Sequence, residues 1–507
     1  MKTMSGLDAA FLHIETPETP MHIGALILLE KPAGHQGSFL PEIKRLLAPR
    51  LALEPFFRAR LATMPLGFAN PVWVDDGLPD LGYHIRHFYL SKPGTRAQLE
   101  ERVAALHGTL LDRSRPLWEL TVIEGLQDGS VALYFKVHHA TLDGAAGIAL
   151  AASLFDRSAT PAAVPANWRE LAERGEQTGL VPRVQSALSQ TAGQYLKLVR
   201  HLPDALGVLG GVFGSLTSKG EDGMRQNLGF GPRTVFNVPI SGTRHCATAS
   251  LPLKSVVQLA QYFEVSFNDI VLAICSGALR QYLRDNDGIP RKPLIATVPV
   301  SLRGAGDTKA TIQATLTLVN LATHIADPRK RLQAIHGAAS AAVSLTRRAK
   351  SVMPTDFPSL GMPWWLGTLA KLYGASKLAS KIPPIANVAI SNVPGPQQPM
   401  YVAGAKITGY WPLSLVEHGL GLNITVISYA DALHVGLVAA DEAVPEIAPL
   451  ADAIVAAFDE LVQLVPVLAP PVAPRKRRSK PTVKVSPTPP TLQLSADTPP
   501  PPSDLMH

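Results

Sequence analysis

The stretch that most constrains this chain is His-His-Ala-Thr-Leu-Asp-Gly, residues 138–144, which follows a run of alternating apolar residues. In residues 131–137 apolar side chains recur at every second position, which predicts a β-strand with one buried face. We expect His138 and His139 to continue that strand, so that their side chains point to opposite faces. A helix of small and apolar residues is expected to follow over residues 145–155.

The residue types in this stretch suit proton transfer to or from a hydroxyl group. An imidazole titrates near neutral pH and can take the proton of an alcohol when a neighbouring group holds it in the right tautomer. His139 is therefore a candidate general base, and Asp143 is either a second base or a structural carboxylate. Gly144 either allows a close backbone approach or is an ordinary turn glycine. The alternative is that both histidines are satisfied side chains of the core or the strand end.

Metal and cofactor chemistry are not expected. Adjacent histidines on a strand cannot both reach one ion, which disfavours a metal site made of His138, His139 and Asp143. A Gly-x-Ser-x-Gly sequence, which would indicate a serine nucleophile, does not lie beside the histidines. We therefore expect no metal, no resident cofactor and no covalent intermediate.

Composition indicates a large globular protein with few cysteines. The two cysteines among 507 residues provide no disulfide framework, which fits a reducing cytoplasm. No uninterrupted apolar stretch reaches the roughly 20 residues that a membrane-spanning helix needs. Asp8, His13 and Glu15 interrupt the apolar character that a signal peptide would require at the N-terminus.

The C-terminal residues 469–507 are rich in proline and are expected to form a disordered tail. Residues 471–507 hold six Lys and Arg against two Asp, a net +4 of the chain's +7. This basic cluster either touches anionic lipid or acidic polymer or is a solvated, solubilising tail. The remainder shows no aromatic and basic pattern typical of nucleic-acid binding, so nucleic acid is not an expected partner.

Alternating strand and helix patterns predict an α/β fold built from two halves. The expected division is a first half over 1–157, a helical connection and flexible loop over 158–243, and a second half over 244–468. The elements expected outside the first half are helices over 168–176, 182–200 and 268–283, strands over 294–302 and 388–392, and a hairpin of 420–429 with 433–438.

Further motifs make the chain resemble the bacterial wax ester synthase/acyl-CoA:diacylglycerol acyltransferases. This family belongs to the superfamily of chloramphenicol acetyltransferase and the peptide-synthetase condensation domains. The matching motifs run in order across about residues 4–465, and they are the opening segment 4–24, Arg115-Pro-Leu-Trp-Glu119, Asn268-Asp269, Val298-Pro-Val-Ser-Leu-Arg303 and Ser391-Asn-Val-Pro-Gly395. One departure is that the family's Gly-Asn pair after the central strand is replaced by Ala310-Thr-Ile-Gln-Ala314, so no role is carried over to it.

The resemblance implies two chloramphenicol-acetyltransferase-like halves, each a mixed β-sheet covered by helices, with the active site between them. It implies an O-acyltransferase that moves a long-chain fatty acyl group from acyl-CoA, as co-substrate, to a fatty alcohol or a diacylglycerol. It also implies a cytoplasmic protein peripherally associated with the inner membrane or with lipid droplets. The preferred alcohol and the oligomeric state are left open by the sequence.

Roles for the remaining site residues follow from the same resemblance. His138 is expected to shape the site, and Asp143 to form a structural ion pair with Arg58, with Arg60 as the second choice for that arginine. Pro116 and Trp118 are expected to pack beneath the site.

Asn268, followed by Asp269, opens a predicted helix. Its amide NH₂ is a candidate donor to the negative charge that develops on a thioester oxygen, and the alternative is an ordinary helix cap.

Two other functions remain open. One is a condensation-type acyltransferase that uses carrier-protein thioesters, against which the Pro-Leu-Trp-Glu and Ser-Asn-Val-Pro-Gly motifs and the absence of carrier domains within the chain argue. The other is a non-catalytic lipid-droplet protein, against which the intact residues 138–144 argue.

Overall fold

The computed structural model describes residues 2–4, 6–62, 70–141, 147, 150–151, 153–173, 230–301, 314–349 and 383–466. Several predicted features lie outside these ranges, namely Asp143, Gly144, part of the helix over 145–155, the helix over 182–200, residues 310–313 and the tail over 469–507. At the end of the first of these helices, the amide of Phe155 donates to the carbonyl of Ala151, as in an α-helix.

The first large sheet is built mainly from the N-terminal part of the chain. Its strand order is β12-β13-β2-β7-β6-β5. Its strands are β2 (His22–Glu30), β5 (Ile85–Tyr89), β6 (Trp118–Glu124), β7 (Val131–His138), β12 (Tyr401–Val402) and β13 (Ala405–Leu413). The helices of this part are α1 (Gly6–Ile14), α2 (Leu40–Leu53), α3 (Pro55–Arg58), α4 (Leu81–His84), α5 (Arg96–Gly108) and α7 (Trp168–Glu173). A small sheet joins β1 (Lys2–Thr3), β4 (Val72–Asp75) and β3 (Ala59–Ala62).

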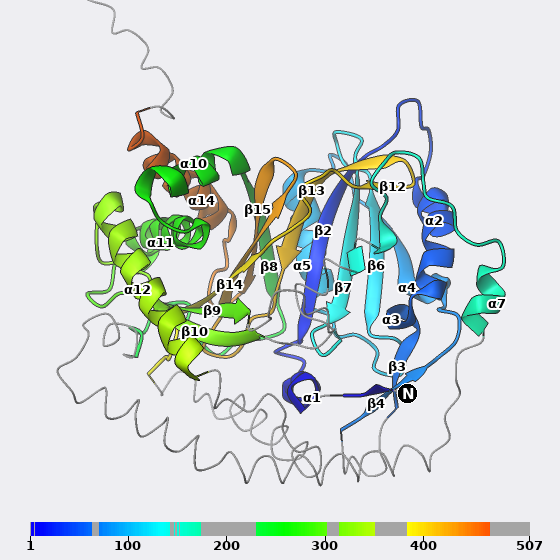
Figure 1. Cartoon of the computed structure of the whole chain (residues 1–507), viewed down its shortest axis with the longest axis horizontal. Coiled ribbons are helices and arrows are strands. Elements are labelled where there is room, and N and C mark those ends of the chain that lie inside the picture. Colours follow the sequence, from blue (N-terminus) through cyan, green and yellow to red (C-terminus); the bar gives the residue numbers. More distant parts are fainter. Residues whose placement is uncertain are drawn as a thin grey trace, which may run out of the picture. The chain divides into compact units, whose positions relative to one another are not determined.

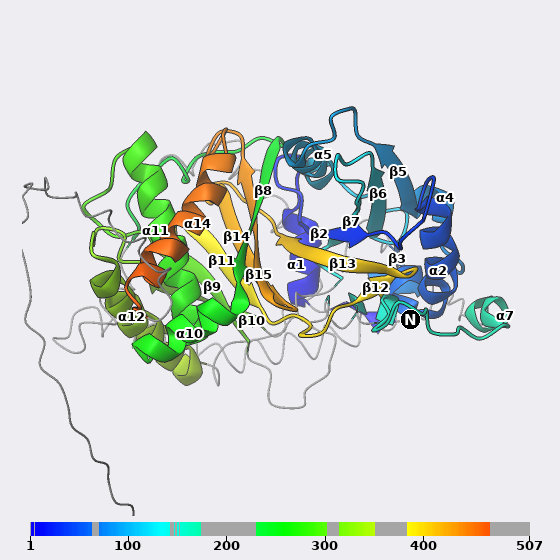
Figure 2. The ribbon, with the colours of Figure 1, turned by 90° about the horizontal axis from the view of Figure 1, so that it is seen from above.

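The second large sheet has the order β10-β9-β11-β14-β15-β8. Its strands are β8 (Arg244–Pro252), β9 (Ile295–Ser301), β10 (Ala314–Asn320), β11 (Val388–Val393), β14 (Leu422–Tyr429) and β15 (Ala432–Ala440). Figure 2 shows α10 (Leu253–Phe263), α11 (Phe267–Asn286), α12 (Pro328–Ala349) and α14 (Ala448–Gln463) gathered along one side of it. Both sheets mix parallel and antiparallel pairs, because β5 runs parallel to β6 and β11 parallel to β14.

The two sheets do not divide at one point of the sequence, because β12 and β13 lie within residues 244–468 yet belong to the first sheet. In Figure 1 the late strand β13 lies beside the early blue strand β2, and Trp411 pairs with Leu26 across the two strands. The buried side chains of β13 complete the apolar cluster under β2, as Ile407 and Ile27 show. Strand pairing over so long a sequence separation leaves no local signal, because each strand shows only its own alternation.

Polar contacts also join the two parts. Arg96 on α5 donates from Nη2 to Oγ1 of Thr248 on β8 at 2.6 Å. The indole N–H of Trp411 donates to the carbonyl of Ala249 at 3.0 Å. Strand pairing, packing and hydrogen bonds therefore join the early and the late parts of the chain.

The strand predicted over 131–137 is confirmed as β7, but the expectation for its end is only half right. His138 is the last residue of β7, whereas His139 already lies in a turn. The turn closes because the amide and the hydroxyl of Thr141 both donate to the carbonyl of His138, at 3.0 and 2.6 Å.

The other predicted elements that fall on described residues are confirmed with small shifts of their ends. They are α7, α11, β9, β11 and the hairpin of β14 with β15. Among the described helices, none alone has the length and apolar character to span a membrane. α10 and α11 meet that criterion only as a pair, which is bent by 105°.

His107, at the end of α5, is a buried neutral histidine that ties the two parts together. Its Nε2 faces the carbonyl of Ser414 at 3.0 Å and its Nδ1 faces the hydroxyl of Tyr134 at 2.7 Å. A carbonyl can only accept, so Nε2 carries the proton and Nδ1 accepts from the tyrosine. Burial lowers the pKa of His107 to about 3.

We expect this histidine to make the protein sensitive to acid. Below the ordinary pKa near 6.5, His107 is protonated in the unfolded chain but stays neutral in the folded chain. The free energy of unfolding therefore falls as the pH drops from 6.5 towards 3. Between pH 7 and pH 5 the loss from this group is about 2 kcal/mol of unfolding free energy. Urea unfolding at several pH values should show a shallower acid dependence for His107→Gln than for the natural protein. Equal slopes would contradict the assignment.

Candidate active site

His138 is held rigidly at the end of β7. Its amide donates to the carbonyl of Leu117 at 3.1 Å, and its side chain is fully buried. The amide of Ala140 donates to Nδ1 at 3.0 Å, so that nitrogen carries no proton and the ring proton sits on Nε2. Nε2 lies 3.2 Å from Oε1 of Glu15. His138 is therefore a neutral imidazole of defined tautomer, whose ring cannot turn without breaking these contacts.

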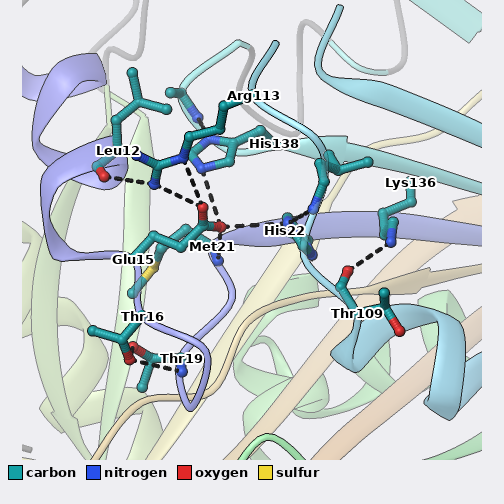
Figure 3. A network of polar contacts seen from close by, with 12 residues as sticks. Leu12, Glu15, Thr16, Thr19, Met21, His22, Thr109, Arg113, Lys136 and His138 are labelled. Atoms are coloured by element: carbon teal, nitrogen blue, oxygen red, sulfur yellow. Dashed lines mark hydrogen bonds and ion pairs between the residues drawn. The ribbon is translucent and has the colours of Figure 1, made fainter. Parts of the chain in front are cut away.

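The centre of this network is the carboxylate of Glu15, which follows α1 and is buried (Figure 3). Its Oε2 accepts from Nε and Nη2 of Arg113 at 3.1 and 2.7 Å. Its Oε1 accepts from the amide of Met21 at 2.9 Å and lies 3.4 Å from Nε2 of His22. Burial alone would raise the pKa of Glu15, but hydrogen bonds from His138 and His22 hold it well below its usual range.

Sequence reasoning missed this network. Glu15 and His22 lie in the opening segment, which was matched as a motif without any role for single residues. His22 pairs directly with His138 in the β2–β7 ladder, and burial lowers its pKa. Nothing in the sequence distinguished Glu15 and His22, because residues 4–24 also hold Asp8, His13 and Glu18.

Lys136, two residues before His138, joins the same strand to α5. Its side chain is almost fully buried, and Nζ donates to the carbonyls of Leu106 and Thr109 at 2.9 and 2.8 Å. Figure 3 shows its contact with Thr109. These carbonyls lie at the end of α5, where a helix leaves acceptors without helical partners and favours a cation. Burial lowers the pKa of Lys136.

Replacing Glu15 with Gln should destabilise the protein, because the amide leaves Arg113 without its charge partner and matches the remaining donors poorly. We expect a loss of about 2 kcal/mol in the free energy of unfolding. Urea denaturation measures it. The matched control is Glu42→Gln, whose carboxylate lies 3.4 Å from the exposed Arg45, and which should change stability by less than about 0.5 kcal/mol. Equally small effects of both variants on the unfolding free energy would show that Glu15 does not stabilise this network.

His139 has a different environment. Its amide donates to the carbonyl of Met21 at 2.8 Å, which extends the β2–β7 pairing by one bond. Its ring stacks on that of Phe11 from α1, with centroids 4.2 Å apart and an angle of 15° between the planes. Nδ1 is shielded from solvent, although the residue as a whole is only half-buried. Of the two adjacent histidines, His138 is enclosed and His139 is partly open.

The arginines expected to pair with Asp143 have acidic partners on or beside β4. Nη2 of Arg58, a buried residue at the end of α3, lies 2.9 Å from Oδ2 of Asp75. Nε of Arg60 donates to Oδ1 of Asp76 at 2.5 Å. Asp143 is not among the described residues, so its pairing with Arg58 stays a prediction.

Pro116 and Trp118 are both buried. The indole N–H of Trp118 donates to the carbonyl of Phe57 at 3.0 Å, and its ring stacks on His84 at 4.2 Å. Trp118 also pairs with Val137 in the β6–β7 ladder. The Pro-Leu-Trp motif thus supports the strand that ends in His138.

The alternative role of Asn268 as a helix cap is wrong. Ser266 is the N-cap of α11, and its hydroxyl accepts from the amide of Asp269 at 3.1 Å. Asp269 completes a capping box by accepting from the amide of Ser266, and its Oδ2 also contacts Nδ1 of His336 at 2.8 Å. Asn268 is left half-buried in the first turn, where its Oδ1 accepts from Nδ2 of Asn392 at 3.5 Å. Two motifs far apart in sequence, Asn-Asp and Ser-Asn-Val-Pro-Gly, therefore meet.

Within the described ranges, no group of three or more His, Cys, Asp or Glu side chains is arranged to hold a metal ion.

Comparison with known proteins identifies the family. The wax ester synthase/diacylglycerol acyltransferase catalytic domain matches residues 4–271, and the C-terminal domain of the same family matches residues 313–462. The chain belongs to the wax ester synthase/diacylglycerol acyltransferase family. It is 39% identical over 445 residues to a putative diacylglycerol O-acyltransferase of Mycobacterium tuberculosis, an alignment that covers 88% of this chain and 96% of the relative.

Solved structures agree with this membership. The wax ester synthase/diacylglycerol acyltransferase of Marinobacter aquaeolei superposes with a TM-score of 0.66 at 30% identity, covering 92% of this chain and 99% of the other. The first condensation domain of the CDA synthetase superposes with a TM-score of 0.52 at 13% identity, covering 91% and 96%, which shows a common fold alone. The predicted α/β fold of two chloramphenicol-acetyltransferase-like halves is confirmed, and the chain is an O-acyltransferase.

Proposed function

We propose that this chain transfers a long-chain fatty acyl group from acyl-CoA to the hydroxyl of a fatty alcohol or a diacylglycerol, with His139 as general base. The observation that carries the proposal is the contrast between the two histidines. His138 is enclosed, with the amide of Ala140 donating to its Nδ1 and Oε1 of Glu15 3.2 Å from its Nε2. His139 lies in the turn beyond the strand and is only half-buried. A general base must be held firmly and still meet a substrate, and His139 combines a fixed backbone with a partly open ring.

The reaction needs one proton to move twice. Nε2 of His139, the ring nitrogen farther from the backbone, takes the proton of the alcohol as its oxygen attacks the thioester carbonyl carbon. The carbon–sulfur bond then breaks, and the imidazolium returns the proton to the thiolate, releasing CoA and the ester. A thioester is already activated, so no acyl-enzyme and no resident cofactor are required.

The surrounding residues have supporting roles in this scheme. Glu15 and His138 hold the end of β7, so the turn that carries His139 starts from a fixed point. Asn268 retains its NH₂ as a donor because its Oδ1 is the atom that faces Asn392. We place that NH₂ against the thioester oxygen, where negative charge develops.

The partners and location that we propose follow from the substrates. Long acyl chains, fatty alcohols and diacylglycerols partition into lipid, so the enzyme should work in the cytoplasm at the surface of the inner membrane or of lipid droplets. The six Lys and Arg side chains of residues 471–507 would favour an anionic surface.

Replacing His139 with Ala should lower kcat by about 10²- to 10⁴-fold while the melting temperature changes little. The assay follows free thiol release from palmitoyl-CoA with hexadecanol or a diacylglycerol as acceptor. His139→Gln, which keeps most of the side-chain volume, serves as the matched variant and should be equally inactive. A near-normal rate in either variant would rule out His139 as the base. Thiol release without ester formation in the natural protein would argue against the proposed acceptors.

Replacing Asn268 with Asp keeps an acceptor for Asn392 but removes the NH₂ donor. We expect kcat to fall by about 10²- to 10³-fold, because a single oxyanion donor contributes that much in known enzymes. The control is Ser266→Ala, which removes the helix cap and should lower the unfolding free energy by about 1 kcal/mol without a comparable loss of kcat. If both variants lose stability and neither loses rate, Asn268 has only a structural role.

A further inference from the structure

The first helix of the chain reaches the proposed catalytic histidine. Phe11, in the second half of α1, lies face to face with the ring of His139, at 4.2 Å between centroids and 15° between planes. The Glu15 that contacts His138 follows directly after the same helix. α1 and the residue that follows it therefore contact the two imidazoles of residues 138–144.

The position of α1 is set by contacts that do not involve His139. Its buried side chains Ala9 and Leu12 share an apolar cluster with Leu117 and with Ala140, the residue after His139. Nη2 of Arg113 donates to the carbonyl of Leu12 at 2.7 Å, next to its contact with Glu15.

The end of α1 is held by one more contact, because Nε2 of His13 lies 3.0 Å from Oδ1 of Asn70. These contacts fix the helix that carries Phe11. The Phe11 ring therefore cannot shift along with the imidazole if the imidazole moves.

We propose that Phe11 is a positioning residue for the acyl transfer, and this inference rests on His139 being the general base. A ring held flat against the imidazole restricts rotation about the Cβ–Cγ bond of His139, so the plane of the imidazole keeps one orientation. The face of an aromatic ring is electronegative and attracts a cation. The stack therefore favours the imidazolium that forms as the alcohol loses its proton, and this stabilisation is greater in the transition state than in the ground state.

A second stack of a histidine on an aromatic ring has nearly the same geometry but a different environment. His84 lies on Trp118 at 4.2 Å and 18°, nearly the same geometry. There the histidine is buried, and its Nδ1 contacts the carbonyl of Trp118 at 2.8 Å. That imidazole is a packed structural group, whereas His139 is half-buried and follows the strand end that the Glu15 network secures.

The test compares Phe11→Leu with Phe11→Tyr in the full-length enzyme. Leu keeps apolar volume but has no ring face, so kcat should fall about tenfold with little change in the KM for palmitoyl-CoA. Tyr keeps the face and should retain kcat within about twofold. Ile43→Val, a buried change on α2, is the control for a general loss of stability and should leave kcat unchanged. Normal kcat in Phe11→Leu, or an equal loss in Phe11→Tyr, would overturn the proposal.

A spectroscopic measurement tests the stack without relying on activity. In protein labelled at histidine, the ring protons of His139, assigned by the signal lost in His139→Gln, should be shifted upfield by the Phe11 ring. The shift should disappear in Phe11→Leu and persist in Phe11→Tyr. A His139 signal unaffected by Phe11→Leu would show that the stack is not formed in solution.

A double variant separates this inference from the proposed function. If His139 is the base and Phe11 acts through it, adding Phe11→Leu to His139→Ala should cause no further loss of rate. An active His139→Ala enzyme refutes the general base itself. An inactive His139→Ala enzyme together with a fully active Phe11→Leu enzyme refutes only the positioning role.

Discussion

The buried carboxylate of Glu15 is the interaction on which the arrangement of this site depends. It gathers a guanidinium, a backbone amide and two imidazoles from β2, β7 and the segments before β2 and β6. A charge so deeply enclosed is tolerated only when its oxygens are fully engaged, so each partner must be in place for the others to remain. The end of β7, where strand gives way to the turn carrying His139, is therefore a rigid position in the protein.

The pairing of β13 with β2 stabilises the first sheet in the same way that Glu15 stabilises the end of β7. β13 follows nearly the whole chain yet pairs with β2, the direct neighbour of β7 in the first sheet. His107 and Arg96 on α5 add hydrogen bonds to Ser414 and Thr248 in the later part of the chain. Because β13 from the late part of the chain completes the first sheet and these contacts join the two parts, the strands that carry His138 and Asn392 belong to one connected framework. That framework brings residues of distant motifs together, as the contact between Asn268 and Asn392 shows.

Much of the local structure could be predicted from sequence, and the errors have clear physical causes. The alternation in residues 131–137 predicted β7, but the position of the turn after His138 depended on Thr141 bonding back to its carbonyl. Asn268 was offered as a possible cap because asparagine is common there, whereas the serine two residues earlier takes that role with Asp269 as its reciprocal partner. The sheet to which β12 and β13 belong could not be predicted, because the alternation within a strand does not show which strand lies beside it.

What the sequence by itself determined is the chemistry and the class of fold. Residues 138–144, the Pro-Leu-Trp motif and the order of the later motifs indicated the family, and apolar periodicity located the strands and helices. Only the tertiary structure decided which histidine is enclosed, that Glu15 and Arg113 secure it, and that Phe11 lies on the other one. Periodicity reports which side of an element is buried, since that is a local property of the chain. The partner that a buried polar group finds depends on where distant segments come to lie, and single-sequence patterns carry no record of that.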